Sequence, residues 1–263
     1  MTTPFSMDSF RLDDQVAVIT GGAGIYGSGF AAALATAGAT VVITSRTAAV
    51  AESAAAALVA KGGNAVGLPL DQADPESIDS FAATLLDRFG RVDVLINNAV
   101  HRAGGGLFDT TAEDWDATSA VNSRGLFLLT RAVAAIMVEQ RSGSIINIGS
   151  IYGMVSPDFT LYEGTPVDPV AFYSYDKGGM IGFTRYLAGE LGPYDIRVNC
   201  LCPGGYNPSG EPSDFDTAYA ARTPLRRMAT GHDASGACVF LASPAAAYVT
   251  GAVIPVDGGW TSR

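Results

Sequence analysis

Short apolar runs alternate along this chain with longer segments of helical spacing. The run at residues 16–19 is uninterrupted and rich in β-branched side chains, which is typical of a parallel strand covered on both faces. Six comparable runs follow, at residues 40–44, 65–70, 92–96, 144–148, 196–201 and 253–256. The alternation predicts one α/β domain over residues 1–263, a Rossmann-type, doubly wound parallel sheet of about seven strands with helices on both faces.

The segments between these runs predict six helices and two irregular stretches. The first helix ends at Gly38, and the others lie at about residues 48–60, 74–90, 111–139, 173–191 and 233–242. Residues 151–170 have no clear period, and residues 203–223 predict a loop or lid. Polar residues follow the strand ends, so we expect a ligand at the carboxyl edge of the sheet.

Glycines join the first strand to the first helix. Gly22, Gly24 and Gly27 have G-x-G-x-x-G spacing. At such a turn a side chain would hold a pyrophosphate away from the backbone N–H groups and from the positive end of the helix. Because a strand precedes these glycines and a helix follows them, a nucleotide site is a better interpretation than a turn without a ligand.

Composition narrows the functional classes. Hydrophobic residues make up 48% and charged residues 16% of the 263 residues, as in a globular domain. The net charge of −10 disfavours nucleic acid and an anionic membrane as partners. The first ten residues have no secretory signal pattern, so we expect a cytoplasmic protein. The three cysteines lack C-x-x-C spacing, and we expect no metal site.

Tyr173 and Lys177 are four residues apart and therefore share one face of a predicted helix. A phenol ionises near pH 10, and a cation in contact lowers its pKa by roughly 1 to 3 units. Such a tyrosine can donate or accept a proton at a reacting C–O centre. For an isolated Tyr-x-x-x-Lys match, an ordinary amphipathic pair is the alternative.

Several motifs occur together in the order and spacing of one family. They are Thr20-Gly21 with Gly27, Asp71, Asn97-Asn98-Ala99, Asn122, Ser150, Tyr173, Lys177, Pro203-Gly204 and Asp257-Gly258-Gly259-Trp260. On these residues the whole chain resembles the short-chain dehydrogenase/reductase family in its compact single-domain form. The resemblance implies hydride transfer between a nicotinamide cofactor and the carbon of a secondary alcohol or ketone.

The resemblance also implies roles for individual residues. Tyr173 would be the general acid/base, and Ser150 would hydrogen-bond the substrate oxygen. Lys177 would lower the pKa of Tyr173 and hold the ribose hydroxyls, and Asn122 would support a water between Lys177 and solvent. The expected cofactor contacts are Thr20, Gly21, Gly22, Gly24, Ile25, Tyr26, Gly27, Ser45, Arg46, Asp71, Gln72, Asn98, Ala99, Tyr173, Lys177, Pro203 and Gly204.

The sequence departs from the family pattern at three places. Ile25 occupies the position of the middle glycine, so we expect the phosphate contacts to shift by one residue, and Val100 replaces the glycine after Asn-Asn-Ala. Ser150 precedes the tyrosine by 23 residues, roughly ten more than in the family. Ser156 and Ser174 are alternative serines, but Ser150 directly follows a strand.

The end of the second strand predicts the cofactor. NAD-preferring members of the family carry an acidic residue there for the ribose 2′-OH, whereas this chain has Ser45 and Arg46. A guanidinium suits a 2′-phosphate, and no carboxylate opposes it. We predict NADP(H), with NAD as the alternative if Arg46 stacks on adenine or is simply solvated.

The extra residues between Ser150 and Tyr173 leave the sheet and return beside the reacting carbonyl, so we expect them to line the substrate pocket. The expected substrate contacts are Ser150, Tyr152, Tyr162, Glu163 and Tyr206. The general likeness to gluconate 5-dehydrogenase-like members suggests a polyol, sugar or sugar acid. An oligomer contact or a folded-away insertion is the alternative for this segment.

The resemblance further implies a homodimer or homotetramer built on the helices that start near residues 111 and 173. Two other functions stay open. A non-catalytic nucleotide sensor would lack the tyrosine or the lysine, and both are present. A sugar epimerase or dehydratase fits the glycine spacing but needs a larger C-terminal substrate region.

Overall fold

Seven parallel strands form the centre of the molecule. The computed structural model describes residues 6–165 and 169–262. The strands are β1 (Val16–Ile19), β2 (Thr40–Ser45), β3 (Asn64–Pro69), β4 (Val94–Asn97), β5 (Gly143–Ile148), β6 (Ile196–Pro203) and β7 (Val253–Val256). Their order is β3-β2-β1-β4-β5-β6-β7, which confirms the predicted Rossmann-type fold. The winding reverses between β1 and β4, and sheets of this kind bind ligands at that point.

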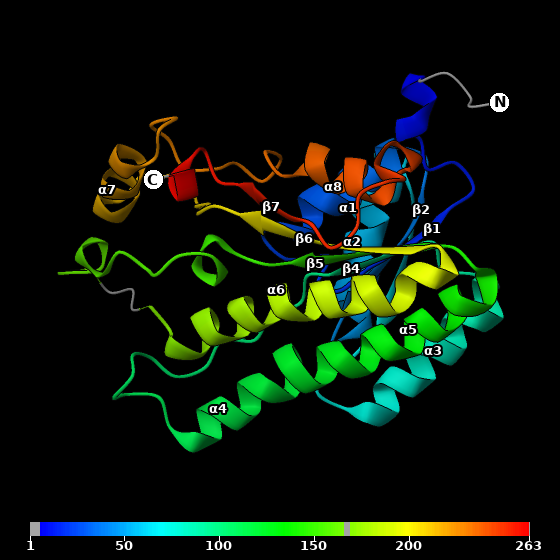
Figure 1. Ribbon diagram of the computed structural model, residues 1–263, viewed down its shortest axis with the longest axis horizontal. Helices are drawn as coiled ribbons and strands as arrows, with labels where there is room; N and C mark the ends of the chain where they lie inside the picture. The colour runs from blue at the N-terminus through cyan, green and yellow to red at the C-terminus, as the bar shows by residue number, and fades with distance from the viewer. Residues whose placement is uncertain (1–5, 166–168, 263) are drawn as a thin grey trace.

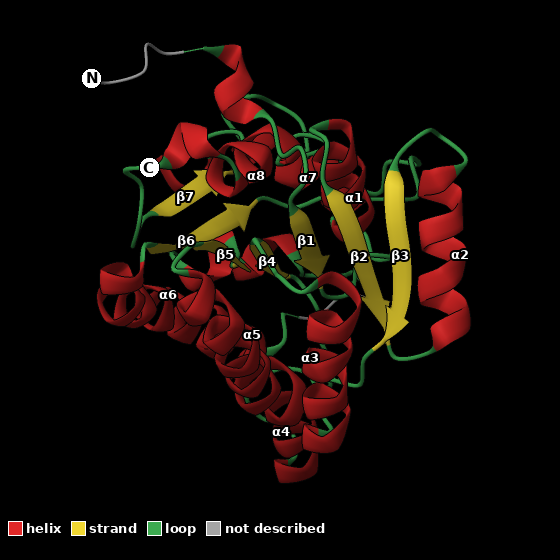
Figure 2. Cartoon of the chain, turned by 90° about the vertical axis from the view of Figure 1, so that its right-hand side faces the viewer, coloured by secondary structure: helices red, strands yellow, loops and turns green. Residues whose placement is uncertain are grey.

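Eight α-helices among the described residues cover the sheet on both faces (Figure 2). They are α1 (Gly27–Thr36), α2 (Ala48–Val59), α3 (Pro75–Phe89), α4 (Ala112–Ser119), α5 (Leu126–Gln140), α6 (Ala171–Leu191), α7 (Asp214–Arg222) and α8 (Ser235–Ala242). Short 3-10 turns lie at Met7–Phe10, Ile151–Gly153, Phe159–Leu161, Gly192–Tyr194, Pro244–Ala246 and Trp260–Ser262. Helices α1, α2 and α8 pack on one face, and α3, α5 and α6 on the other.

Each face of the sheet has its own hydrophobic core. Val18 and Leu95 point to the side of α3, α5 and α6, whereas Ile19 and Ile96 point to the side of α1 and α8. All four side chains are fully buried. A strand covered on both faces is apolar without alternation, which explains the uninterrupted runs in the sequence.

Element boundaries differ from the sequence prediction by about two residues. β4 begins at Val94 because the backbone of Val92 pairs with the side chain of Gln140 instead of with a neighbouring strand. β6 continues through Pro203. Helix α6 starts two residues earlier than predicted and α8 two residues later.

The helix predicted at residues 111–139 contains a wide turn. Thr111 caps α4 in the predicted capping box with Asp114, and Ala120–Gly125 then form a π-helical turn, η2, before α5 begins. By length and composition alone the segment Ala112–Gln140 could cross a membrane, but 44% of its apolar window is buried inside the protein. Its inner side packs against the sheet and α3, as in the core helix of a globular enzyme.

Two irregular segments lie beyond the carboxyl edge of the sheet, at the left of Figure 1. The segment after β5 is organised by the turns Ile151–Gly153 and Phe159–Leu161, and its residues 166–168 lie outside the described residues. The stretch predicted as a loop or lid contains α7, so the prediction of an irregular chain is wrong there. Ser213 caps this helix in a capping box with Asp216, a sequence signal that predicts a helix start.

Candidate active site

Hydrogen bonds to the loop after β4 hold the glycine turn. Thr20 Oγ1 accepts from the N–H groups of Asn98 and Ala99, at 2.9 and 2.8 Å, and the Asn98 amide donates to the carbonyls of Thr20 and Gly21. Gly21 has a φ of 60°, and a Cβ on Gly27 would lie 2.4 Å from the Gly21 carbonyl oxygen. The turn itself therefore requires glycine at both positions.

The first turn of α1 is open to an anion. Tyr26, at the N-cap position, provides no side-chain cap, and Gly24 is exposed beside it while Gly22 is buried beneath the turn. The side chain of Ile25 is 54% exposed and stands outside the turn. A helix start without a side-chain cap and the positive helix end fit a pyrophosphate in spite of the isoleucine, and a one-residue shift of the contacts stays a prediction.

The ends of β2 and β3 offer a cation and a carboxylate. Ser45 is half-buried and Arg46 is exposed, and Arg46 takes part in no ion pair among the described residues. The Asp71 carboxylate accepts from the Ala73 N–H at 3.0 Å, which fixes its position just past β3. These residues fit the adenosine end of a dinucleotide.

Gln72 braces the π-helical turn. Its buried side chain donates from Nε2 to the Val121 carbonyl at 3.0 Å, and Arg124 in the same turn donates to the Ala73 carbonyl at 3.0 Å. Two side-chain hydrogen bonds thus join the loop after β3 to η2. A contact between Gln72 and a cofactor stays a prediction.

Ser150, Tyr173 and Lys177 meet at the ends of β5 and α6. Ser150 is close enough to the Tyr173 hydroxyl to lower its pKa, whereas Ser156 is exposed and Ser174 lines a cavity together with Tyr152 and Val170. Lys177 Nζ lies 5.6 Å from the centre of the Tyr173 ring and donates to a β5 backbone carbonyl at 2.7 Å. Lys177 is 3% exposed, so the backbone holds a buried ammonium beside the phenol, as the four-residue spacing predicted.

Two cations act on the phenol of Tyr173. Burial alone would raise its pKa, but Lys177, Arg102 and the hydrogen bond with Ser150 outweigh that effect, and the pKa of Tyr173 is lowered. The guanidinium of Arg102 covers the ring, with 4.4 Å between Cζ and the ring centre. The phenol can therefore exchange its proton closer to neutral pH than a free tyrosine can.

Asn122 ties the loop after β4 to the π-helical turn. Its Oδ1 accepts from the His101 N–H at 2.8 Å, and its Nδ2 donates to the His101 carbonyl at 2.9 Å. The same amide favours the ionised form of Asp176 on α6. His101 thus occupies both polar atoms of this side chain, and the predicted support of a water by Asn122 stays a prediction.

The segment after Ser150 is clamped to α7. Tyr152 and Tyr162 share a hydroxyl–hydroxyl hydrogen bond of 2.6 Å, and the Tyr162 ring lies 5.2 Å from that of Phe215 on α7. Arg222, at the end of α7, forms a salt bridge of 2.6 Å with Asp158. The insertion and α7 therefore form one wall beyond the carboxyl edge of the sheet.

The two tyrosines of this wall lie toward the catalytic residues. The positive charge of Arg102 acts on the Tyr162 hydroxyl. The hydroxyls of Tyr152 and Tyr162 both interact electrostatically with Tyr173. Burial raises the pKa of each hydroxyl, which keeps both protonated at neutral pH as hydrogen-bond donors. Glu163 is exposed, and its predicted substrate contact stays a prediction.

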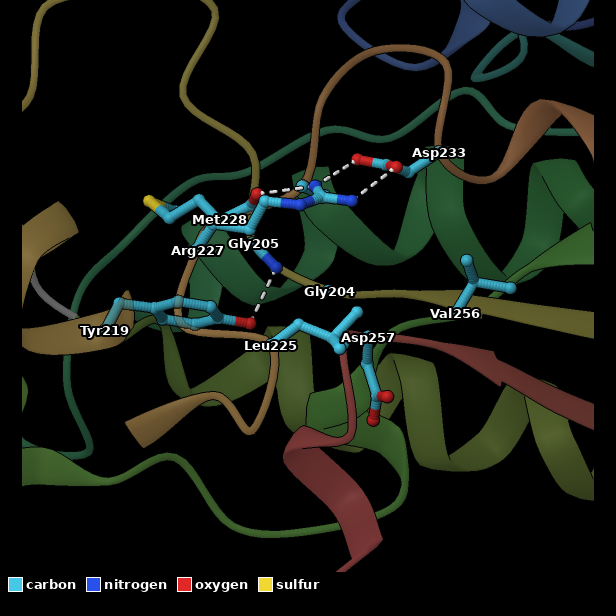
Figure 3. A pocket seen from close by; sticks show the side chains of 11 residues that line it. Gly204, Gly205, Tyr219, Leu225, Arg227, Met228, Asp233, Val256 and Asp257 are labelled. Atoms are coloured by element: carbon cyan, nitrogen blue, oxygen red, sulfur yellow. Dashed lines mark hydrogen bonds and ion pairs between the residues drawn. The ribbon is translucent and has the colours of Figure 1, made fainter. Parts of the chain in front are cut away.

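Figure 3 shows a cavity of about 100 Å³ between the end of β6 and α7. The Tyr219 hydroxyl accepts from the Gly205 N–H at 2.7 Å across it. On its other side the Tyr219 ring stacks on Trp260, with 4.3 Å between ring centres. These contacts fix α7 relative to the end of β6.

Tyr206 lies beside the glycine turn. Its ring centre is 5.6 Å from that of Tyr26, and the Tyr26 hydroxyl donates to the Gly204 carbonyl at 2.8 Å. Pro203 and Gly204 are buried at the end of β6. The glycine turn and the loop after β6 thus meet through Tyr26, and the substrate contact expected for Tyr206 stays a prediction.

Known proteins resemble this chain over nearly its whole length. A family model described as enoyl-(acyl carrier protein) reductase matches residues 22–261. The chain is 37% identical over 250 residues to a 3-oxoacyl-[acyl-carrier-protein] reductase of Synechocystis. The aligned residues cover 94% of this chain and 97% of the relative. The chain belongs to the short-chain dehydrogenase/reductase family. Other members include the D-threitol dehydrogenase of Mycolicibacterium smegmatis, which is 34% identical over 261 residues, 97% of this chain and 95% of the relative.

A solved member shows how closely the folds agree. A gluconate 5-dehydrogenase of Burkholderia cenocepacia, in complex with NADP and tartrate, superposes with a TM-score of 0.89 at 31% identity, over 97% of this chain and 98% of that chain. As a short-chain dehydrogenase/reductase, the present protein is an NAD(P)-dependent oxidoreductase that interconverts a secondary alcohol and a ketone.

Two residues at this dehydrogenase site were not predicted from the sequence. Arg102 follows the Asn-Asn-Ala motif closely, and a cation in that short loop was the available signal. Asp176 is four residues from both Phe172 and Met180, so helical spacing already places it on the buried face of α6. No pattern in the sequence shows that the loop carrying Arg102 folds over the Tyr173 ring.

Proposed function

We propose that the protein is an NADP(H)-preferring oxidoreductase for polyhydroxylated secondary alcohols that carry a carboxylate, such as sugar acids, and for the corresponding ketones. The main support for this proposal is Arg102. Its exposed guanidinium lies over the Tyr173 ring and takes part in no ion pair among the described residues. A carboxylate is the natural partner of an unpaired guanidinium, and the hydroxyls of Tyr152 and Tyr162 suit a polyol. Relatives named for gluconate and threitol support the same substrate class.

The chemistry assigned to the chain is proton transfer. When bound, the nicotinamide supplies or accepts the hydride. In reduction, Tyr173 donates its proton to the developing alkoxide oxygen, and Ser150 hydrogen-bonds that oxygen as its charge grows. Lys177 stabilises the phenolate that is left behind, because its buried ammonium is held beside the ring.

The preference for NADP(H) rests on Arg46. Its exposed side chain lies just past β2, where a 2′-phosphate would be met. Arg46→Ala should lower kcat/KM for NADP+ about tenfold to a hundredfold, the loss expected for one charged hydrogen-bonding partner, and leave the value for NAD+ nearly unchanged. Equal kcat/KM for the two cofactors in the wild-type protein would contradict the preference.

The substrate class is tested by a panel with both cofactors, read by the absorbance of the reduced nicotinamide. It contains a sugar acid, the polyol of the same chain length, a simple secondary alcohol and a 3-oxoacyl thioester. We expect the highest kcat/KM for the sugar acid. Arg102→Ala also removes one of the two cations that lower the pKa of Tyr173, so it should lower kcat/KM for both substrates, but more for the sugar acid than for the polyol. Arg102→Lys should keep part of the advantage of the sugar acid. Preferred turnover of the thioester would reject the sugar-acid assignment.

We also propose a cytoplasmic homodimer or homotetramer. Helices α5 and α6 expose large apolar side chains, among them Phe127 at 46% and Tyr186 at 62%. On α6, a Cβ placed on Gly182 or Gly189 would meet no atom within 4 Å, so this surface is open and shallow enough for close approach of another helix. Gly182→Glu should reduce the mass measured by light scattering.

A further inference from the structure

Asp176 is a buried carboxylate without a part in the proton transfer described above. It lies on α6 directly before Lys177 and is 6% exposed, and its Oδ2 has no hydrogen-bond partner among the described residues. Burial raises the pKa of Asp176 to about 6, although Lys177 and Asn122 favour the ionised form. A buried carboxylate with an unpaired oxygen costs free energy of folding, which points to a function.

A chain of contacts leads from Asp176 to the reacting tyrosine. The Asn122 amide is close enough to Asp176 to favour its ionised form, and Asn122 holds both backbone groups of His101. The next residue, Arg102, covers the ring of Tyr173. The charge on Asp176 therefore lies at the start of the network that positions one of the two cations acting on the phenol.

The second connection is electrostatic. On α6, Lys177 is the cation whose field reaches both Asp176 and Tyr173. The neighbour of Asp176 on η2 is the side-chain amide of Asn122, which carries no charge. Two titratable residues of the loop after β4 belong to the same network. His101 meets Asn122 through its backbone, and Arg102 follows it in the chain.

We propose that Asp176 is a positioning residue of the hydride-transfer site. In its ionised form it offsets part of the Lys177 charge that favours the Tyr173 phenolate, and so sets how readily Tyr173 gives up its proton. The kinetic consequence rests on the proposed function, whereas the ionisation of Tyr173 is a property of the folded protein alone.

The primary test follows the ionisation of Tyr173 without a substrate. The tyrosinate absorbance of each protein is measured against pH, and the curve of the same protein with Tyr173→Phe is subtracted. Asp176→Asn keeps the shape of the side chain and removes the charge. It should lower the pKa of Tyr173 by roughly half to one unit, as expected for the loss of one nearby charge in a partly screened interior.

A second variant and a matched control keep the result unambiguous. Asp176→Ser also removes the charge and should give the same shift where the asparagine variant does not fold. Glu190→Gln removes a negative charge from the exposed end of the same helix, roughly 20 Å away, and should leave the pKa of Tyr173 unchanged. Equal tyrosine pKa values in wild type and both Asp176 variants would overturn the proposal.

The kinetic readout separates positioning from a merely structural role. In the oxidation direction the pH profile of kcat/KM should shift to lower pH in Asp176→Asn by the same amount as the tyrosinate curve. A kcat reduced equally at every pH, with an unmoved profile, would show that Asp176 is structural only. If the wild-type protein oxidises no alcohol, the proposed function fails, and the absorbance titration still decides the role of Asp176.

Discussion

Asp176→Asn should stabilise the folded protein at neutral pH and much less in acid. The folded protein holds the pKa of this carboxyl at about 6, compared with 3.8 for the free group. Because the folded value is the higher one, the contribution of the group to stability is fully present below pH 4 and is lost as the pH rises through 6. Asparagine has no charge to bury at any pH and avoids that loss.

The size of the effect follows from the two pKa values. A difference of about two units corresponds to about 3 kcal/mol in the free energy of unfolding at pH 7.5, where the carboxyl is ionised in both states. At pH 5 the carboxyl is mostly protonated in the folded protein and mostly ionised in the unfolded chain. The corresponding difference in the free energy of unfolding is then about 1.5 kcal/mol. The advantage of the variant should therefore grow by about 1.5 kcal/mol between these pH values, or several degrees in Tm.

Urea or thermal unfolding of wild type, Asp176→Asn and the control Glu190→Gln at pH 5 and 7.5 measures this difference. The control should show no pH-dependent advantage over wild type, because Glu190 is exposed. An asparagine variant that is less stable than wild type at pH 7.5, or equally favoured at both pH values, would refute the reasoning. Combined with the expected change at Tyr173, added stability would mark Asp176 as a residue kept for activity.

Further predictions concern the phenol, the wall of the pocket and the assembly. Tyr173→Phe should keep the Kd for NADPH in a fluorescence titration and lose turnover, and a near wild-type kcat would show the catalytic assignment to be wrong. Tyr162→Ala should raise KM about tenfold or more through loss of a half-buried hydrogen-bond partner, and Glu163→Ala should raise it as well through the contact predicted for that exposed carboxylate. An unchanged KM in both variants would assign the insertion to structure instead. Arg222→Ala breaks a half-exposed salt bridge with Asp158, so Tm should fall by no more than a few degrees while KM rises. Light scattering at micromolar concentration should give a dimer or tetramer, and a monomeric mass would contradict the proposed assembly.

The fold was largely predictable because its signals are local. Strands buried on both faces are apolar throughout, and the helices between them carry caps and glycine stops, such as Asp74 before α3 and Gly90 after it. Cys200 and Cys202 lie on one face of β6, as the two-residue period of a strand requires. Their sulfurs are 3.7 Å apart and buried, as expected for small core residues.

The site was predictable only where local geometry decides it. The spacing of Tyr173 and Lys177 is a property of one helix turn, and Ser150 stands at a strand end. Arg102 and the wall of the pocket depend instead on contacts between distant parts of the chain, such as the salt bridge that joins Asp158 to Arg222. Nothing in either local sequence specifies such a partner, so these parts required the structure.

The π-helical turn at Ala120–Gly125 has a consequence for insertions and deletions in this chain. An α-helix turns by about 100° per residue, and a wide turn holds one residue more than an α-helical turn of the same rise. The extra residue lets α5 bury Leu129 and Val133 under the sheet while α4 packs Trp115 against Phe172. A one-residue deletion here would rotate α4 relative to α5. The apolar face of one of the two helices would then turn toward water. The length of this segment therefore sets which faces of α4 and α5 are buried, independently of the side chains that it carries.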